Sequence, residues 1–293
     1  EIVSRDWSSD VCSSDLGQRL GQPGVAAVRP LRRLLALALM ALPLAAVAEA
    51  PPASPLQIEG EVAQGGMLRG RVPPGTRVRS NGGEVPVASS GAFVIGLARD
   101  ATPWLTVTAF LADGTSVQKK LTVAERTWDV QRIDGLPERQ VSPSASDLIA
   151  IREEQKKIAD SRAKTRDADA FMQPFLWPVT GTITGVYGSQ RILNGEPRAP
   201  HLGIDIAAPE GTPIKAPADG VVTLAARGLF LNGNLVILDH GLGVTTAYAH
   251  LAQIRVIGGQ PIRRGDVIGT MGKSGRATGA NLHFGVNVRG VGV

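Results

Sequence analysis

The feature of this 293-residue sequence that most restricts its fold is the shortness of its apolar runs. Between residues 57 and 123, short alternating runs are split by turn residues, and from Trp177 onward glycine and proline leave no helical period of any length. Runs of about four to eight residues bounded by turn signals are typical of β-strands. The sequence therefore predicts a mainly β protein, with a small antiparallel β-sandwich over 57–130 and an all-β domain over 177–293.

The first of these regions carries hairpin chemistry but no catalytic chemistry. Asn81-Gly82-Gly83 and Asp113-Gly114 are the residue types of tight β-turns, since asparagine, aspartate and glycine tolerate a positive φ. Between residues 57 and 130 there is no histidine and no cluster of carboxylates. We therefore interpret this region as a spacer or a binding module.

Residues 144–170 are predicted to form a helix that links the two β regions. The segment has no glycine or proline and is rich in helix-forming residues. Ser144 and Asp147 make a loose form of the capping box, which normally has Glu or Gln at the second position. The apolar stripe is narrow and consists of Leu148, Ile151, Ile158 and Ala159. A helix that packs lightly between domains is the favoured interpretation, and a partner-binding coiled coil is the alternative.

Residues 29–48 have the order of a secretory signal: arginines, a short apolar run and a small-residue cleavage site. The apolar run from Leu34 to Leu44 is too short to span a bilayer, because a spanning helix needs about 20 apolar residues. Cleavage is predicted after Ala48, and an N-terminal anchor helix is the alternative. The sequence thus predicts an exported protein, periplasmic or secreted, with no integral membrane association after cleavage.

Residues 1–16 show neither periodicity nor capping residues and resemble translated sequencing-adapter sequence. Residues 1–48 are therefore predicted to be an adapter-like leader plus a signal peptide. The only cysteine, Cys12, lies within them. The mature chain is accordingly predicted to have no disulfide, no lipid-anchor cysteine and no thiol chemistry.

Composition argues against a nucleic-acid partner. Aromatic residues make up 4% of the chain, and the basic residues do not cluster with stacking aromatics. No phosphate-binding glycine loop precedes a helix. The net charge of +5 suits an anionic envelope polymer, although many soluble proteins have the same balance.

All four histidines lie in the C-terminal β region. His201 and Asp205 are four residues apart, so in a strand they would face the same side, with Gly203 leaving space between them. One nitrogen and one oxygen ligand suit Zn²⁺, although this pair alone also fits a salt bridge.

Two further segments show the same even spacing. Asn281 and His283 share one face of a predicted strand, and Tyr248 and His250 repeat the pattern. His283 would complete a set of three protein ligands, which is the number in a catalytic zinc site with an open fourth position. His250 would then be an outer-sphere acid or hydrogen-bond donor. His240, beside a glycine-rich turn, is predicted to be structural.

These residues carry a resemblance to a known family. The C-terminal region resembles the lysostaphin-type (LytM-like) zinc metallopeptidases, which cut peptide cross-links in bacterial peptidoglycan and have the duplicated hybrid motif fold. The resemblance covers about Trp177–Val288. Its motifs are H-x-G-x-D at 201–205, D-H-G-x-G at 239–243, Y-A-H-L at 248–251 and L-H-F at 282–284.

The resemblance assigns roles to individual residues. It implies that His201, Asp205 and His283 hold Zn²⁺ and that His250 is a catalytic histidine. It implies that Tyr187 helps to hold the oxyanion. The expected function is an exported zinc metalloendopeptidase acting on peptidoglycan peptide cross-links, with the peptidase domain at 177–293. The sequence does not identify a divisome or hydrolase partner.

One residue departs from the family pattern. The family usually has H-x-H, whereas this chain has Asn281-Leu282-His283, so asparagine replaces the histidine that helps to activate water. Asparagine can hydrogen-bond but cannot take up a proton at neutral pH. We therefore expect a catalytic role for Asn281 in orienting water, with reduced activity. The alternative is a catalytically impaired module that binds peptidoglycan or activates another hydrolase.

A second alternative is a biotinyl or lipoyl carrier domain, because the segment around RRGDVIG resembles such a hairpin. A carrier domain needs a modifiable lysine at an exposed turn. The only nearby lysine, Lys273 in MGKSGR, lacks the expected flanking residues, and the histidines would have no role.

Overall fold

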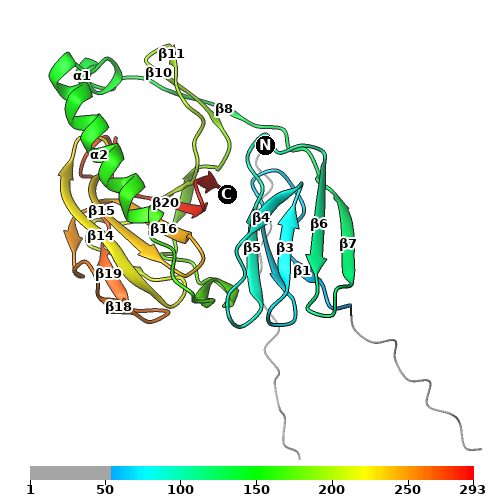
Figure 1. The fold of residues 1–293 in the computed structure, drawn as a ribbon. Helices are drawn as coiled ribbons and strands as arrows, with labels where there is room; N and C mark the ends of the chain where they lie inside the picture. The colour runs from blue at the N-terminus through cyan, green and yellow to red at the C-terminus, as the bar shows by residue number, and fades with distance from the viewer. Residues whose placement is uncertain (1–53) are drawn as a thin grey trace, which may run out of the picture. The chain divides into compact units, whose positions relative to one another are not determined.

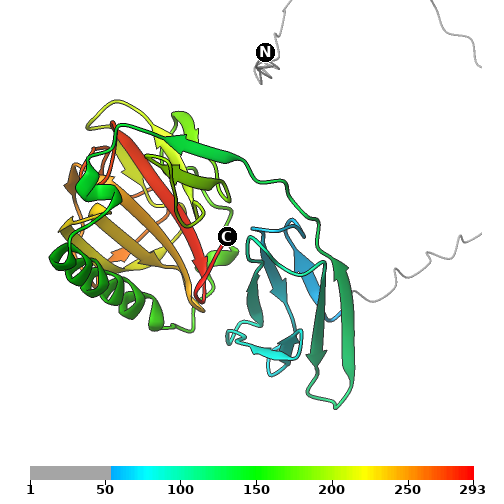
Figure 2. The same cartoon turned by 90° about the horizontal axis from the view of Figure 1, so that it is seen from above.

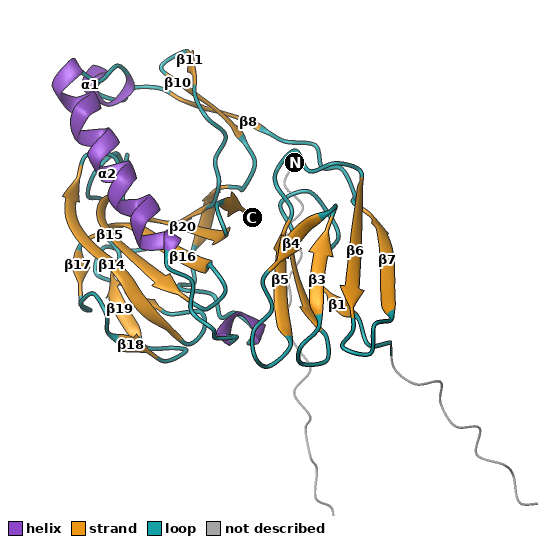
Figure 3. Ribbon diagram, viewed as in Figure 1, coloured by secondary structure: helices purple, strands orange, loops and turns teal. Residues whose placement is uncertain are grey.

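The structure is a computed structural model that describes residues 54–293, and the predicted leader and signal peptide, residues 1–48, lie outside the described residues. Strands dominate the described part of the chain, with one long helix (Figure 3). The predicted mainly β fold class is confirmed.

Seven strands form two N-terminal sheets. They are β1 (Gln57–Glu59), β2 (Met67–Arg71), β3 (Arg77–Ser80), β4 (Gly83–Val85), β5 (Ala92–Gly96), β6 (Trp104–Phe110) and β7 (Ser116–Thr122). One sheet has the order β1-β2-β5 and the other β4-β3-β6-β7. Leu68 and Phe93 from the first sheet and Val107 from the second belong to one buried cluster, because alternate residues of each strand point inward. The Asn81-Gly82 turn has φ values of 47° and 85°, which is the geometry of a two-residue hairpin loop.

The next segment leaves these sheets. β8 (Val130–Ile133) pairs in parallel with β10 (Gln190–Leu193), which belongs to the C-terminal region. A short helix, α1 (Glu138–Val141), follows. The chain between the two β regions therefore takes part in the structure of the second region.

The long helix α2 spans Ala145–Ala163, and the predicted range 144–170 is too long at its C-terminal end because Lys164 is already extended. The loose capping box forms: the Ser144 hydroxyl accepts from the Asp147 N–H, and the Asp147 carboxylate accepts from the Ser144 N–H, each at 3.2 Å. Ile158 packs against the buried face of the large C-terminal sheet, so α2 lies across that sheet (Figures 1 and 2). No helix in the described residues is long and apolar enough to cross a membrane.

The C-terminal region begins with the short 3-10 helix η1 (Ala170–Met172) and is otherwise built from strands. They are β9 (Thr182–Gly185), β10, β11 (Glu196–Pro197), β12 (Ile204–Ala207), β13 (Pro213–Lys215), β14 (Gly220–Leu229), β15 (Gly233–Asp239), β16 (Val244–Leu251), β17 (Gln253–Ile254), β18 (Pro261–Ile262), β19 (Val267–Thr270), β20 (Asn281–Val288) and β21 (Val291–Gly292). The large sheet has the order β18-β14-β15-β16-β20-β12-β9, with β21 beside β20. A small sheet, β13-β19-β17, packs against it through a buried apolar cluster that includes Ile214, Val236, Ile268 and Leu282.

The register of the large sheet places the chemically important residues together. β20 lies between β12 and β16. His283 of β20 pairs with Asp205 of β12 on one side and with Ala249 of β16 on the other. The neighbour of Ala249 is His250. These three adjacent strands therefore carry most of the polar side chains that the sequence singled out.

Candidate metal centre

The structure brings His201, Asp205 and His283 together around one point. His201 Nε2 lies 2.9 Å from His283 Nδ1, and Asp205 Oδ1 lies 3.1 Å from His201 Nε2 and 2.9 Å from His283 Nδ1. In a tetrahedral zinc site with bonds of about 2.0–2.1 Å, ligand atoms are about 3.3 Å apart. The three ligand atoms thus have a spacing close to that of a shared cation.

His201 reaches this point by a route that strand parity did not predict. β12 begins only at Ile204, so His201 lies in the segment before the strand. Its N–H donates to the Ser189 carbonyl at 2.9 Å, and its carbonyl accepts from the Gly188 N–H at 2.7 Å. These backbone bonds hold His201, and the even spacing to Asp205 is not the cause.

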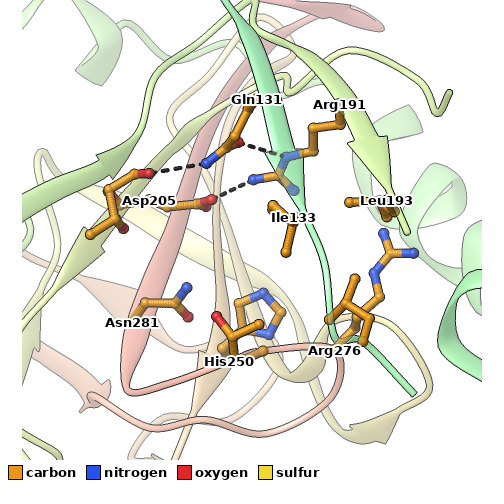
Figure 4. Close-up of a pocket in the computed structure, with 12 residues that line it drawn as sticks. Gln131, Ile133, Arg191, Leu193, Asp205, His250, Arg276 and Asn281 are labelled. Atoms are coloured by element: carbon orange, nitrogen blue, oxygen red, sulfur yellow. Dashed lines mark hydrogen bonds and ion pairs between the residues drawn. The ribbon is translucent and has the colours of Figure 1, made fainter. Parts of the chain in front are cut away.

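Two hydrogen bonds orient the ligands through the atoms that do not face the shared point, namely His201 Nδ1 and Asp205 Oδ2. His201 Nδ1 lies 3.1 Å from the Val186 carbonyl, which accepts the Nδ1–H and leaves the Nε2 lone pair toward the other ligands. Asp205 Oδ2 accepts from Arg191, so Asp205 Oδ1 is the oxygen that remains for the histidines (Figure 4). Gln131 lies next to Arg191, with 3.4 Å between Gln131 Oε1 and Arg191 Nε.

Glycines provide the space that the ligands occupy. A Cβ on Gly203 would lie 2.7 Å from His283 Cε1 and 2.6 Å from the Phe284 carbonyl oxygen. A Cβ on Gly185 would lie 2.7 Å from Asp205 Oδ2. Any side chain at either position would push a ligand out of place.

Burial and charge favour the protonation states that a metal requires. Burial lowers the pKa of His201, which keeps its ring neutral. Burial by itself would raise the pKa of Asp205, but its interactions with the His201 and His283 rings outweigh burial and leave the pKa well below its usual value. Neutral imidazole and ionised carboxylate are the forms that bind cations.

His250 lies beside the three ligands, and its backbone conformation is unusual. Its φ is +64°, in the left-handed region that side-chain-bearing residues rarely adopt and that is frequent at functional sites. The Ser274 carbonyl accepts from His250 Nδ1 at 2.8 Å, so Nε2 carries the lone pair of the neutral ring. Burial lowers the pKa of His250 and favours that neutral form.

The predicted parity of Tyr248 and His250 is wrong. Tyr248 is fully buried in the apolar core, and its hydroxyl lies 2.8 Å from Thr246 Oγ1. The left-handed conformation of His250 breaks the alternation at the end of β16, so His250 lines a cavity instead of the core.

Asn281 lies at the start of β20, and its side chain lines the same cavity as Asp205 and His250 (Figure 4). Asn281 Oδ1 is buried, and no described residue donates a hydrogen bond to it. A buried acceptor without a donor is costly, typically about 1–3 kcal/mol, which indicates that water or a ligand normally supplies the donor.

Tyr187 and His240 have partners of their own. The Tyr187 hydroxyl donates to the Gly292 carbonyl at 2.8 Å, and its ring lies edge-on to Trp128. Tyr187 does not line the cavities that contain His250, so its predicted catalytic role stays a prediction. His240 is fully buried, with its nitrogens 2.6 Å from the Asp219 carbonyl and 2.8 Å from Thr246 Oγ1. Its structural role is confirmed.

Two cavities that share Arg191, Leu193, His250 and Arg276 adjoin at the ligands, and together we call them the groove. One wall is formed by Gln131, Ile133 and Leu136 from β8 and the segment after it. Leu231 and Asn232 come from the turn between β14 and β15, and Arg276 comes from the loop before β20. Sequence analysis missed Gln131, Arg191 and Arg198, because no local pattern connects their segments to the histidines.

Comparisons with known proteins place this site in a family context. Residues 199–293 match peptidase family M23. The chain is 47% identical over 91 residues to the DD-carboxypeptidase/endopeptidase Mpg of Neisseria meningitidis, covering 31% of this chain and 20% of that protein. It is 45% identical over 92 residues to the peptidoglycan DD-endopeptidase ShyA of Vibrio cholerae, covering 31% of this chain and 21% of that protein. The chain thus spans about a fifth of the length of these relatives.

The likeness to a solved structure extends further along the chain. A crystal structure from Pseudomonas aeruginosa, described as that of a candidate M23 peptidase, is similar with a TM-score of 0.61 at 27% identity. The similarity covers 80% of this chain and 92% of that chain. The fold of the described residues therefore has a counterpart that includes more than the segment carrying the histidines.

Proposed function

Because the chain belongs to peptidase family M23 through its C-terminal domain, we propose that it is an exported zinc metalloendopeptidase that hydrolyses peptide bonds in bacterial peptidoglycan. The observation that carries the proposal is the convergence of His201 Nε2, His283 Nδ1 and Asp205 Oδ1 within 3.1 Å of one another. The peptidoglycan substrate is supported by the activity in the name of ShyA.

The donor set fits zinc. A single N–H on His283 Nδ1 can point at only one of its two neighbours, whereas a cation between the three atoms satisfies all of them. Two nitrogens and one carboxylate oxygen are ligands that Zn²⁺ prefers, and three protein ligands leave a fourth position open. When bound, the metal supplies Lewis-acid polarisation and lowers the pKa of water.

His250 is the proposed proton carrier. Its Nδ1–H is held by the Ser274 carbonyl, so Nε2 is the atom that can accept a proton from the attacking water. The water oxygen forms the new C–O bond as Nε2 takes this proton, and Nε2 then delivers the proton to the amine that leaves as the C–N bond breaks. The hydrogen bond to Ser274 leaves the lone pair on Nε2, and the left-handed backbone places the ring at the groove, so Nε2 can make both transfers.

Asn281 and Tyr187 complete the proposed catalytic set. Asn281 Oδ1 accepts a hydrogen bond from the attacking water and orients it, which satisfies an otherwise partnerless buried acceptor. Asn281 cannot act as a base, so both proton transfers fall to His250. Because a dedicated general base is typically worth about 10²–10⁴-fold, we propose a lower rate than with histidine at this position. Tyr187 would assist at the oxyanion only if its hydroxyl leaves the Gly292 carbonyl.

Asn281 also favours a second candidate function. The chain would then be a catalytically impaired module that binds peptidoglycan or activates another hydrolase. The retained ligands His201, Asp205 and His283 support the enzyme instead, since a module that only binds has no need of a metal site.

Metal content and muropeptide release separate these functions. We expect the purified wild-type protein to hold about one zinc ion per chain and to release peptides slowly from peptidoglycan. His201→Ala and Asp205→Asn should lose zinc and activity together. Asp266→Asn is the matched control, because its carboxylate accepts from the Arg263 N–H in the same domain and lies outside the groove.

Asn281→His tests the proposed reason for the reduced rate. Release should increase by about 10²-fold or more when a base occupies this position. Zinc without turnover in both wild type and Asn281→His would support the impaired module. A wild-type protein without zinc would end the enzyme proposal.

A further inference from the structure

Three arginines surround the groove next to the candidate metal ligands. Arg191 comes from β10, Arg198 from the loop after β11 and Arg276 from the loop before β20. All three line one cavity of about 350 Å³, together with His201, His250 and His283. Within the part of the chain that the structure describes, no aspartate or glutamate lines this cavity.

Backbone carbonyls and one shared carboxylate contact these arginines. Arg198 Nη2 donates to the Val141 carbonyl at 2.8 Å. Arg276 is anchored through its backbone N–H, which donates to the Leu231 carbonyl at 2.9 Å. Arg191 does contact a carboxylate, that of Asp205, but this carboxylate is shared with both histidines.

Bringing three guanidinium groups together is electrostatically costly. Burial lowers the pKa of Arg276, and the charges of Arg191 and Arg198 lower it further, so the Arg276 guanidinium lies within electrostatic range of the other two. Like charges in a half-buried site repel more strongly than in water because screening is weaker. An anion that enters the cavity would relieve this repulsion.

The geometry indicates which anion fits. Guanidinium groups bind carboxylates in a planar, two-bonded arrangement, and the resulting hydrogen bonds are about twice as strong as neutral ones. The cavity also contains the histidines at which a peptide would be cut under the proposed function. The anion is therefore expected on the peptide itself, close to the scissile bond.

We propose that Arg198 and Arg276, with Arg191 behind them, bind a free carboxylate of the peptide substrate and make the protein selective for anionic stem peptides. This inference rests on the proposed function. The carboxylate has two possible sources: the C-terminus of an uncrosslinked stem peptide, or the side-chain or α-carboxylate of the diamino acid in a cross-link.

Equilibrium binding to matched peptides tests the inference. The full chain, prepared with its metal, is titrated calorimetrically with an uncrosslinked pentapeptide ending in a carboxylate or an amide. A second pair is a cross-linked peptide dimer whose diamino-acid carboxylate is free or amidated. In at least one pair the carboxylate form should bind about tenfold more tightly or better, and the pair that shows the preference identifies the source.

The variants Arg198→Gln and Arg276→Gln should lose this preference while leaving the amide forms bound as before. Arg255→Gln is the matched control, since Arg255 is an exposed arginine of the same domain outside the cavity, and it should keep the preference. Thermal unfolding and zinc content establish that each variant is folded.

The two proposals fail in different ways. Equal binding of acid and amide in both pairs, or a full preference in both arginine variants, overturns the carboxylate site. Either result, in a protein that holds zinc and releases peptides, leaves the peptidase proposal intact. Absence of zinc overturns the peptidase proposal, whereas the binding preference is still measured.

Discussion

Replacing Gly203 with alanine should release the metal without unfolding the domain. The added Cβ would lie 2.7 Å from His283 Cε1, while ordinary contacts begin at 3.4 Å, so the ring must move by about 0.7 Å. Metal–ligand distances tolerate deviations of only about 0.2 Å. Displacing a group that positions a ligand typically costs about 10–100-fold in metal affinity, and we expect at least this loss.

The assay is zinc affinity measured by competition with a chromophoric chelator, together with thermal unfolding of the metal-free protein. Gly279→Ala is the matched control, because a Cβ on Gly279 meets nothing within 4 Å although the residue lies just before β20. A folded Gly203→Ala protein that binds zinc within twofold of wild type would refute the assignment of His283 as a ligand in this geometry.

Two further predictions concern single hydrogen bonds. Tyr187→Phe removes the bond to the Gly292 carbonyl and should lower the free energy of unfolding by about 0.5–1.5 kcal/mol in urea titrations. If Tyr187 also acts on the oxyanion, turnover falls as well, and unchanged turnover removes it from the catalytic set. Ser144→Ala removes the side-chain cap of α2 and should cost about 1 kcal/mol by the same measurement; no loss of stability would show that α2 is held by its packing on the large sheet alone.

The sequence predicts those features of the fold that depend only on residues close together in the chain. The Asn81-Gly82 hairpin follows from two adjacent residues that tolerate positive φ. Asn281 and His283 share a face because β20 is a regular strand. The structure brings His201 close to Asp205 and His283, as the metal-ligand hypothesis expects, although loop contacts and not strand parity hold His201.

Non-local pairing was beyond such rules. β8 pairs with β10 across almost 60 residues, and nothing in Val130–Ile133 indicates a parallel partner so far along the chain. The positive φ of His250 has the same origin: its N–H donates to the Asn232 carbonyl from another loop, so tertiary contacts override the alternation expected for β16. For the same reason, the sequence does not predict that Arg191 and Arg276 lie close together in the folded chain.

The pairing of β8 with β10 affects which fragments of the protein retain a complete groove. A fragment trimmed to the family-matching residues 199–293 would retain all three histidines of the groove, yet it would discard Gln131, Ile133 and Leu136 and with them one wall of the groove. It would also lack Arg191, the residue that fixes the orientation of Asp205. Any peptide selectivity measured on such a fragment would therefore describe a groove that lacks the wall built by β8.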